Sequence, residues 1–289
     1  WTQCKLHPAD SIKMNNIYKL TDKHTAEHCT QRLVHQPMVS VCLLSYNSRP
    51  WIEQAVKSVL SQNDYYSYEL IISDDGSDDG TYEEYLAGMH WAEPERVKVL
   101  HSYRNLGPDS GMCNFARTLK AARGKYVAIL EADDFWCDDK KLKDQVSFLE
   151  HNADYSCSFT QANVEMHGYE FGRLEKEYGN RKECWQPEEV LDEHFQCATA
   201  GIVFRKDLIE KLPNWFFDTA YFDRPLRGLL AKYGKFHCLQ RRAVTYRSNN
   251  WGTWHKLRQK GVLNSWIESH KVFKGLASYH KEHRPQLAA

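Results

Sequence analysis

Three carboxylates stand within four positions in the segment Glu131-Ala132-Asp133-Asp134, directly after the apolar run 126–130. Carboxylates gathered at the end of a buried strand repel one another and raise each other's pKa. A hard divalent cation removes this conflict, because Mg²⁺ and Mn²⁺ prefer oxygen ligands and often share them with a substrate phosphate. The segment therefore predicts a cation site that serves a phosphate-bearing ligand.

Two further polar clusters follow earlier apolar runs of the chain. They are Ser45-Tyr46-Asn47 and Ser73-Asp74-Asp75-Gly76-Ser77. Each stands where a predicted strand ends, and the ligands of parallel α/β sheets bind beyond the carboxyl ends of the strands. We therefore expect all three clusters to share one site.

The apolar pattern also predicts the elements that position these clusters. Alternating strands and helices from Pro37 onward indicate an α/β fold with a mostly parallel central sheet flanked by helices. The predicted strands are 39–44, 70–72, 97–101 and 126–130, and the predicted helices begin near Ser48, Gly80, Asp109 and Asp138 or Asp139.

The second half of the chain is less regular. We expect a strand at 199–204, a helix at 225–233, short strands at 235–239 and 244–247, and an amphipathic helix from about residue 256. This pattern suggests a polar, irregular extension (1–36), one large domain (37–255) and a helical tail (256–289). An amphipathic tail could contact a membrane surface, but we expect it to pack on the domain.

The composition excludes several classes of protein. The 38 basic and 38 acidic residues balance in a chain of 289, whereas a general nucleic-acid binder is usually basic. No apolar run reaches the roughly 18 residues of a transmembrane helix, and no secretory signal is visible. Nine scattered cysteines are an odd number, which favours free thiols in a reducing compartment. We therefore expect a cytoplasmic location, with peripheral contact at the inner face of a membrane as the alternative. The chain begins with Trp1, as a fragment or a processed product would.

Several common active-site motifs are missing. The chain has no Gly-x-Gly-x-x-Gly loop, no Gly-Lys-Ser/Thr loop and no Gly-x-Ser-x-Gly elbow, so dinucleotide binding, P-loop hydrolysis and α/β-hydrolase chemistry lack their signatures. An EF-hand loop beginning at Asp75 fails at its last ligand, because Leu86 stands where a bidentate Glu is needed.

The polar clusters carry a family resemblance. The segments 39–47, 69–77, 105–107, 123–126 and 131–136 resemble those of family 2 glycosyltransferases of the GT-A fold. The segment 131–136 resembles the family's DxD-type metal motif, in the Glu-first form found in many bacterial members. The resemblance is strong over residues 38 to about 165, moderate over 197–255, and absent from 1–36 and beyond 260.

The resemblance implies roles for the strand-end residues. Tyr46 would stack on a nucleobase, Asp74 would accept a base N–H, and Asp134 would be the direct ligand of a Mn²⁺ or Mg²⁺ ion, with Asp133 beside it. The residues expected around the donor are Ser45, Tyr46, Asn47, Arg49, Asp74, Asp75, Asn105, Gly107, Glu131, Ala132 and Asp133.

An inverting mechanism needs a base that deprotonates the acceptor hydroxyl. The segment 221–226 resembles the region that supplies this base, so we expect Asp223 to serve, with Asp218 as the alternative; Asp223 could equally cap the helix that follows. Arg247 and His255 resemble the family's closing Tyr-Arg-x-His segment and could reach the diphosphate, although the usual His after Tyr-Arg is missing here.

These observations predict a metal-dependent, inverting glycosyltransferase of polysaccharide or glycoconjugate synthesis. Its donor would be a nucleotide-diphosphate sugar, with a UDP-sugar as the default, and its acceptor a hydroxyl of a glycan or lipid-linked glycan. One alternative is a catalytically silent nucleotide- or glycan-binding module on the same fold. A nucleotidyltransferase is less favoured, because that class needs a Gly-rich, basic loop where this chain has Tyr46-Asn47-Ser48-Arg49.

Overall fold

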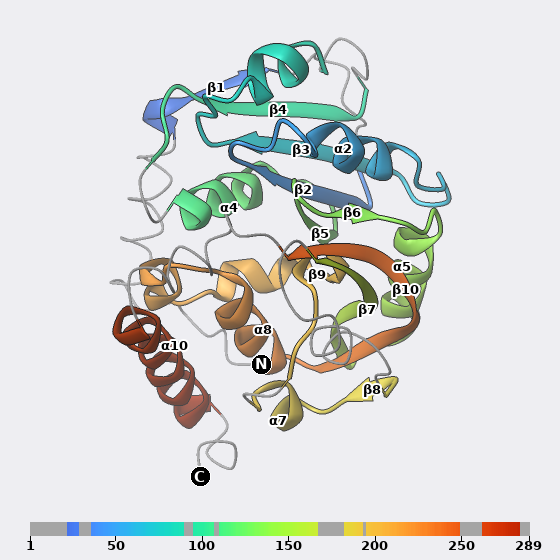
Figure 1. The fold of residues 1–289 in the computed structure, drawn as a ribbon. Helices are drawn as coiled ribbons and strands as arrows, with labels where there is room; N and C mark the ends of the chain where they lie inside the picture. The colour runs from blue at the N-terminus through green and yellow to red at the C-terminus, as the bar shows by residue number, and fades with distance from the viewer. Residues whose placement is uncertain are drawn as a thin grey trace.

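A mixed ten-stranded sheet forms the centre of the protein (Figure 1). The structure is a computed structural model that describes residues 22–28, 36–89, 95–106, 110–166, 182–192, 195–248 and 262–283. The strands are β1 Thr25–His28, β2 Val39–Ser45, β3 Tyr68–Asp74, β4 Val97–Ser102, β5 Tyr126–Glu131, β6 Phe135–Trp136, β7 Tyr155–Met166, β8 Cys184–Trp185, β9 Val203–Arg205 and β10 Lys235–Ser248. Their order is β1-β4-β3-β2-β5-β9-β7-β10-β6, and β8 pairs with β10.

The parallel part of the sheet is buried on both faces. Strands β4, β3, β2 and β5 pair in parallel, and every residue of β2 and β3 is buried. Alternate side chains of β2 enter two different cores, because a strand sends successive residues to opposite faces. Val41 packs with helix α2 (Ile52–Leu60), whereas Cys42 packs with helix α4 (Ser110–Ala121). The near-continuous apolar run of β2 therefore reflects its two covered faces.

The four strands and the helices predicted before residue 152 are confirmed, with two differences. The helix near Gly80 is a short π-turn, η1 (Thr81–Tyr85), followed by a 3₁₀ turn, η2 (Leu86–Gly88). Helix α5 (Lys141–His151) begins after Lys140 instead of an aspartate cap, and the Lys140 N–H donates to Asp138 Oδ1 at 2.9 Å. Later in the chain, the strand expected at 199–204 is shorter, because residues 199–201 form a 3₁₀ turn, η3, before β9. The Ala200 carbonyl in this turn accepts the Trp136 indole N–H.

Strand β7 was not predicted from the sequence, and β10 was predicted as two short strands. In β7 serine, threonine and glutamine alternate with cysteine, phenylalanine and alanine, so the apolar run that marks β2 is missing. Strand β10 pairs with β7 in parallel along its length, with register shifts around Arg242. These irregularities separate the two short segments that the apolar pattern had suggested.

The expected irregular extension contributes an ordered strand. β1 pairs antiparallel with β4 at the edge of the sheet, with Thr25 opposite Ser102 and His28 opposite Val99. Four residues with partly exposed side chains have no hydrophobic periodicity, so a sequence pattern could not reveal this strand.

The expected packing of the C-terminal helix on the domain is confirmed. Helix α10 (Val262–His283) lies beside α8 (Asp223–Ala231) and buries Val272 and Leu276 (Figure 1). Gly228 of α8 allows this approach, because a Cβ there would lie 2.5 Å from Leu276. Among the described helices none combines the length and the apolar character of a membrane span. None of the seven cysteines that the structure describes forms a disulfide.

The remaining elements connect these layers. They are α7 Pro187–Val190, η4 Lys206–Lys211 and η5 Asn214–Asp218.

Candidate functional site

The three polar strand ends meet at one edge of the sheet, as predicted. The Asp75 N–H donates to the Ser45 carbonyl at 3.0 Å, and the Ala132 N–H donates to the Leu44 carbonyl at 2.9 Å. These bonds fix the loops after β2, β3 and β5 against one another. At the centre of this edge the Ser45 hydroxyl is buried and has no hydrogen-bond partner among the described residues, so it is available to a ligand.

The acid cluster includes a carboxylate from the second half of the chain. Burial, together with the charges of Asp133 and Asp223, raises the pKa of Glu131 to about 8. Burial, together with the charges of Asp133 and Glu131, raises the pKa of Asp134 well above its usual value. Asp223, the first residue of α8, therefore lies close enough to act electrostatically on the end of β5. The site brings together four of the predicted residues.

These carboxylates fit a divalent cation shared with a phosphate. Glu131 Oε2 and Asp223 Oδ1 are buried and accept no hydrogen bond from the described residues, an arrangement that costs free energy unless positive charge is present. In the described part of the chain no three His, Cys, Asp or Glu side chains are arranged to hold a metal ion by themselves. Mg²⁺ and Mn²⁺ are commonly held by one or two carboxylates together with substrate phosphates.

Asp134 and Asp133 differ in their surroundings. Asp134 is 2% exposed, and its Oδ1 accepts the backbone N–H of Arg247 at 2.8 Å. Asp133 is partly exposed. The cluster thus has an inner carboxylate, which is tied to strand β10, and an outer one at the surface of the site.

The Arg247 side chain supports the acid cluster at residues 131–134 through contacts inside the protein. Its guanidinium donates to the Asp133 carbonyl at 3.0 Å, to Glu165 Oε2 at 2.9 Å and to Gln54 Oε1 at 2.6 Å. It also lies over the Phe135 ring, 4.6 Å from the ring centroid. These contacts hold the side chain in the fold, so the predicted reach to a diphosphate would require it to leave four partners.

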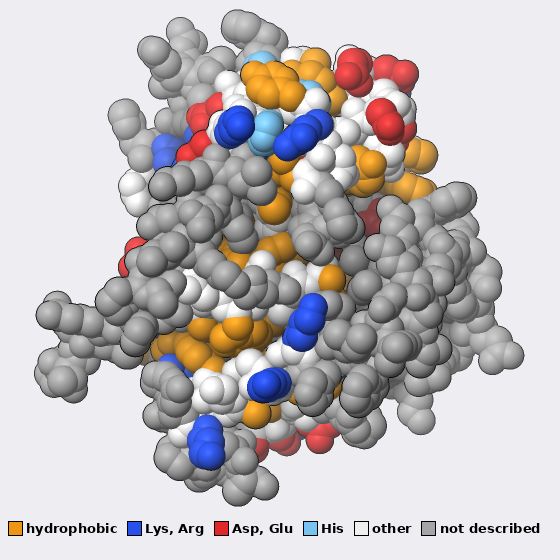
Figure 2. All heavy atoms as spheres, turned by 90° about the vertical axis from the view of Figure 1, so that its left-hand side faces the viewer, with side chains coloured by type: hydrophobic (Ala, Val, Ile, Leu, Met, Phe, Trp, Pro, Cys, Tyr) orange, Lys and Arg blue, Asp and Glu red, His pale blue; other side chains and the backbone are white. Residues whose placement is uncertain are grey.

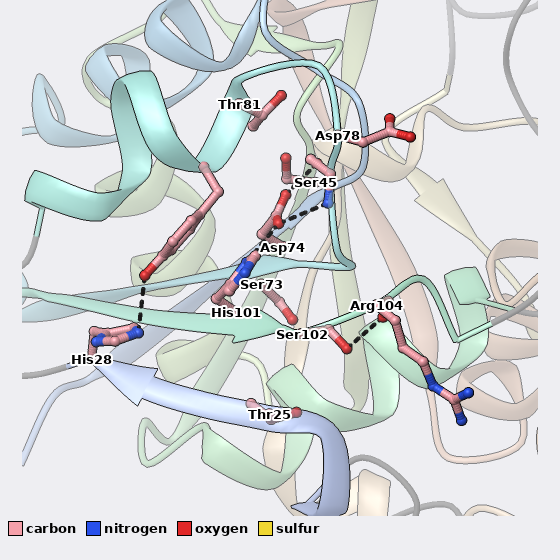
Figure 3. A network of polar contacts seen from close by, with 12 residues as sticks. Thr25, His28, Ser45, Ser73, Asp74, Asp78, Thr81, His101, Ser102 and Arg104 are labelled. Atoms are coloured by element: carbon pink, nitrogen blue, oxygen red, sulfur yellow. Dashed lines mark hydrogen bonds and ion pairs between the residues drawn. The ribbon is translucent and has the colours of Figure 1, made fainter.

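Asp74, which is predicted to contact the nucleobase, is fully buried, and its carboxylate already has hydrogen-bond partners in the protein (Figure 3). Its carboxylate accepts the Ser77 hydroxyl at 2.5 Å and the Ser77 N–H at 3.1 Å, and it lies 3.0 Å from His101 Nδ1. With these partners Asp74 organises the loop after β3. A direct bond to a base N–H stays a prediction.

Tyr46 and Arg49 differ in how they fit a donor site. Tyr46 stands at the rim with 38% of its surface exposed, and its hydroxyl shares a hydrogen bond with the Asn105 side chain. Its position suits a stacking surface. The Arg49 guanidinium instead pairs with Glu84 of η1 at 2.6 Å, so a contact with a donor would have to compete with this ion pair.

Asn47 acts as a link between two loops. It has a left-handed φ of 51°, which asparagine tolerates better than most residues. Its N–H donates to the Ser77 hydroxyl at 2.8 Å, and its side chain exchanges hydrogen bonds with Asp78.

Four residues of this region escaped the sequence analysis. Thr199, the first residue of the turn η3, shares a hydrogen bond with Glu131. His101, Arg117 and Asn114 support the ends of β2 and β3 from β4 and α4. None belongs to a motif, because each acts through residues distant in the chain. Of the other predicted residues, Gly107 and His255 lie outside the described residues, and only the backbone of Asp218 is described.

The surface next to this edge is basic in part. Figure 2 shows Lys, Arg and His side chains gathered around an apolar patch, over the end of the sheet that contains β1 and β4.

Comparison with known proteins identifies the family. The model of "Glycosyl transferase family 2" matches residues 40–212, which is more than half of the chain. The chain belongs to this family. The matched region contains the ends of β2, β3 and β5 described above, and it excludes β1 and α10.

Curated relatives share part of their length with this chain. A putative teichuronic acid biosynthesis glycosyltransferase of Bacillus subtilis is 38% identical over 125 residues, which cover 43% of this chain and 46% of the relative. An Escherichia coli UDP-Glc:alpha-D-GlcNAc-diphosphoundecaprenol beta-1,3-glucosyltransferase is 34% identical over 129 residues, 45% of this chain and 46% of the relative. An uncharacterized Mycobacterium tuberculosis protein is 26% identical over 226 residues, 75% of this chain and 60% of the relative. The chain thus spans about half of the length of these relatives.

Solved structures establish the GT-A fold. The S. aureus protein TarS in complex with UDP aligns with a TM-score of 0.56 at 14% identity, over 86% of this chain and 73% of that one. The mannosyltransferase PcManGT from Pyrobaculum calidifontis, in complex with GDP-Man and Mn²⁺, aligns with a TM-score of 0.53 at 15% identity, over 95% and 84%. These similarities confirm the predicted fold.

Proposed function

We propose that this protein transfers a sugar from a nucleotide-diphosphate sugar to an acceptor hydroxyl, with inversion and with the help of a divalent cation. The donor we favour is a UDP-sugar. The observation that carries the proposal is the position of Asp223 beside the acid cluster, where its charge helps to raise the pKa of Glu131. A base for the acceptor and carboxylates for the diphosphate thereby share one site.

The family's reaction assigns a task to each part of the site. The acceptor oxygen attacks C1 of the sugar while the bond from C1 to the diphosphate oxygen breaks, so the nucleoside diphosphate leaves from the opposite face. Asp223 takes the proton of the acceptor hydroxyl, as a general base. Its Oδ1 accepts no hydrogen bond from the described residues, and the Arg227 guanidinium lies 3.8 Å from its Oδ2. The arginine would hold the carboxylate in orientation.

The carboxylates after β5 would hold the cation. We assign the outermost contact to Asp133 and place Asp134 beneath it, because Asp134 Oδ1 is committed to the Arg247 N–H. When bound, the cation would neutralise charge on the departing diphosphate. Ser45, Tyr46 and Asp75 line the neighbouring strand ends and would bind the nucleoside.

The names of two relatives support a proposal for the acceptor class. The E. coli relative acts on a sugar linked to diphosphoundecaprenol, and the B. subtilis relative is assigned to teichuronic acid biosynthesis. We therefore propose a glycan or lipid-linked glycan acceptor, met by a protein whose described helices do not cross a membrane.

Calorimetry tests the first step of this proposal. Purified protein with Mn²⁺ should bind UDP, and binding should disappear when EDTA removes the cation. Slow hydrolysis of a UDP-sugar without acceptor would then separate an active enzyme from the silent-module alternative. Absence of nucleoside diphosphate binding at millimolar concentration would reject the proposal.

A further inference from the structure

Strand β1 lies outside the region that the family model matches, yet it contacts the residues that shape the nucleotide side of the site. From these contacts we infer that β1 is a positioning element of the nucleotide site, acting through Thr25 and His28. This inference rests on the proposed function and adds an element that the family pattern does not contain.

The first connection runs through Arg117 on the α4 face of the sheet. Arg117 is 4% exposed, and its Nη1 donates to the Thr25 hydroxyl at 3.0 Å. The same guanidinium donates to the Ser73 hydroxyl at 2.8 Å and to the Asp74 carbonyl at 2.8 Å. A planar guanidinium holds several acceptors in fixed relative positions. Thr25 therefore helps to fix the carboxyl end of β3.

The second connection runs on the opposite face (Figure 3). The Tyr82 hydroxyl lies 3.0 Å from His28 Nε2, and the Tyr82 ring stacks on His101 with 3.6 Å between ring centroids. His101 Nδ1 in turn lies 3.0 Å from Asp74 Oδ2. Because strand side chains alternate between faces, a four-residue strand reaches Asp74 from both sides of the sheet.

Asp74 transmits this support to the predicted nucleotide pocket. Its carboxylate accepts the Ser77 N–H and hydroxyl, and the Ser77 hydroxyl also accepts the Asn47 N–H at 2.8 Å. The loops after β2 and β3 are therefore held together at the point where the base would bind. Loss of either connection should loosen these loops without removing any group that touches the nucleotide.

Matched variants of the full chain test this inference. Thr25→Val keeps the shape of the side chain and removes the acceptor of Arg117, whereas Thr25→Ser retains the hydroxyl. Tyr82→Phe keeps the stacking on His101 and removes the bond to His28. Glu27→Gln, also on β1, is the control. It breaks the ion pair between Glu27 and Lys98 of β4 and leaves both connections intact.

Two measurements are made on each variant: UDP affinity with Mn²⁺ by calorimetry, and amide hydrogen exchange of Asp75 and Ser77 without nucleotide. Thr25→Val should weaken UDP binding and speed exchange by about tenfold, as the loss of one hydrogen bond to a charged group would. Tyr82→Phe should change both in the same direction, while Thr25→Ser and Glu27→Gln should remain within about twofold of the wild type, as intact contacts require.

The inference fails if Thr25→Val and Tyr82→Phe leave both measurements unchanged. It also fails if Glu27→Gln has the same effects, since β1 would then contribute only general stability. If the wild-type protein binds no nucleoside diphosphate, the proposed function falls, and the exchange measurement alone still decides whether β1 positions the loops.

Discussion

The proposed role of Asp223 as general base can be tested directly by mutation. Asp223→Asn preserves the size of the side chain but removes its ability to accept the acceptor's proton. We expect kcat to fall by about 10²- to 10⁴-fold, the usual contribution of a general base, while UDP affinity stays unchanged. Turnover of a UDP-sugar and calorimetry with UDP measure the two quantities. Asp154→Asn, at an exposed ion pair with Lys235, is the control. A loss of UDP binding in Asp223→Asn would place the residue in the donor site instead.

Asp133 and Asp134 give the second prediction at this scale. The sequence favoured Asp134 as the direct metal ligand, whereas the geometry favours Asp133, because one oxygen of Asp134 accepts the Arg247 N–H. We expect Asp133→Asn to weaken Mn²⁺-dependent UDP binding by at least tenfold and Asp134→Asn to weaken it less, because the loss of a metal-bound carboxylate removes a strong charge interaction. Electron paramagnetic resonance measures the Mn²⁺ bound by each variant in the presence of UDP. The reverse ranking would restore Asp134 as the ligand.

At the scale of elements, helix α5 buries a charge that its surroundings do not satisfy. Lys141 is fully buried, its Nζ lies 4.2 Å from the Trp136 ring centroid, and no described residue accepts a hydrogen bond from it. Burial lowers the pKa of Lys141 from 10.5 to about 7. The unfolded chain therefore binds more protons than the folded one between these pH values, and stability must rise with pH across this window.

Replacing Lys141 with methionine tests this consequence. The free energy of unfolding of Lys141→Met should exceed that of the wild type by roughly 4 kcal/mol near pH 7, and the difference should shrink as the pH approaches 10.5, because the unfolded lysine then loses its proton too. Urea unfolding at several pH values measures it. Lys140→Met, at an exposed neighbour, should show no such dependence. A pH-independent difference would mean that the pKa of Lys141 is not lowered in the fold, and that the lysine stays charged and solvated there.

The elements that the sequence predicted share one property. Strands β2 to β5 and helices α2 and α4 bury apolar side chains in a simple period, so local pattern and tertiary position agree. Strand β1 has no such pattern, because it is held by its pairing with β4 and by polar contacts. In β7 alternating polar residues conceal a strand that is buried between β9 and β10. Local sequence reveals what a residue buries, but not which distant strand it will join.

The same distinction applies to the site. The acid cluster was visible because three carboxylates adjoin in the chain, and Asp223 was found through family resemblance. Thr199, His101 and Arg117 were missed because their partners lie 27 to 92 residues away in the chain, and their residue types are common in structural roles. Such supporting residues become visible only when the fold brings their partners together.

At the scale of the whole molecule, the parts of the site come from the entire sheet. Loops after β2, β3 and β5 meet α8 from the second half of the chain, with β1 and β10 bracing them from outside the strand ends. A ligand that spans these loops should therefore stabilise the complete fold, because it binds only when all of them are in place. The amount depends on concentration, since stabilisation grows as RT ln(1 + [L]/Kd).

Thermal unfolding with a series of nucleoside diphosphates uses this coupling to identify the donor. At about one hundred times its Kd, a ligand adds about 2.7 kcal/mol, which corresponds to a rise in Tm of about 5 °C or more for a protein of this size. We expect UDP with Mn²⁺ to give this rise, GDP to give less, and EDTA to abolish it. Asp133→Asn should remove the metal-dependent part of the shift. Equal shifts with UDP and GDP would mean that the loops recognise the diphosphate and cation alone, and a larger shift with GDP would replace UDP as the proposed donor nucleotide.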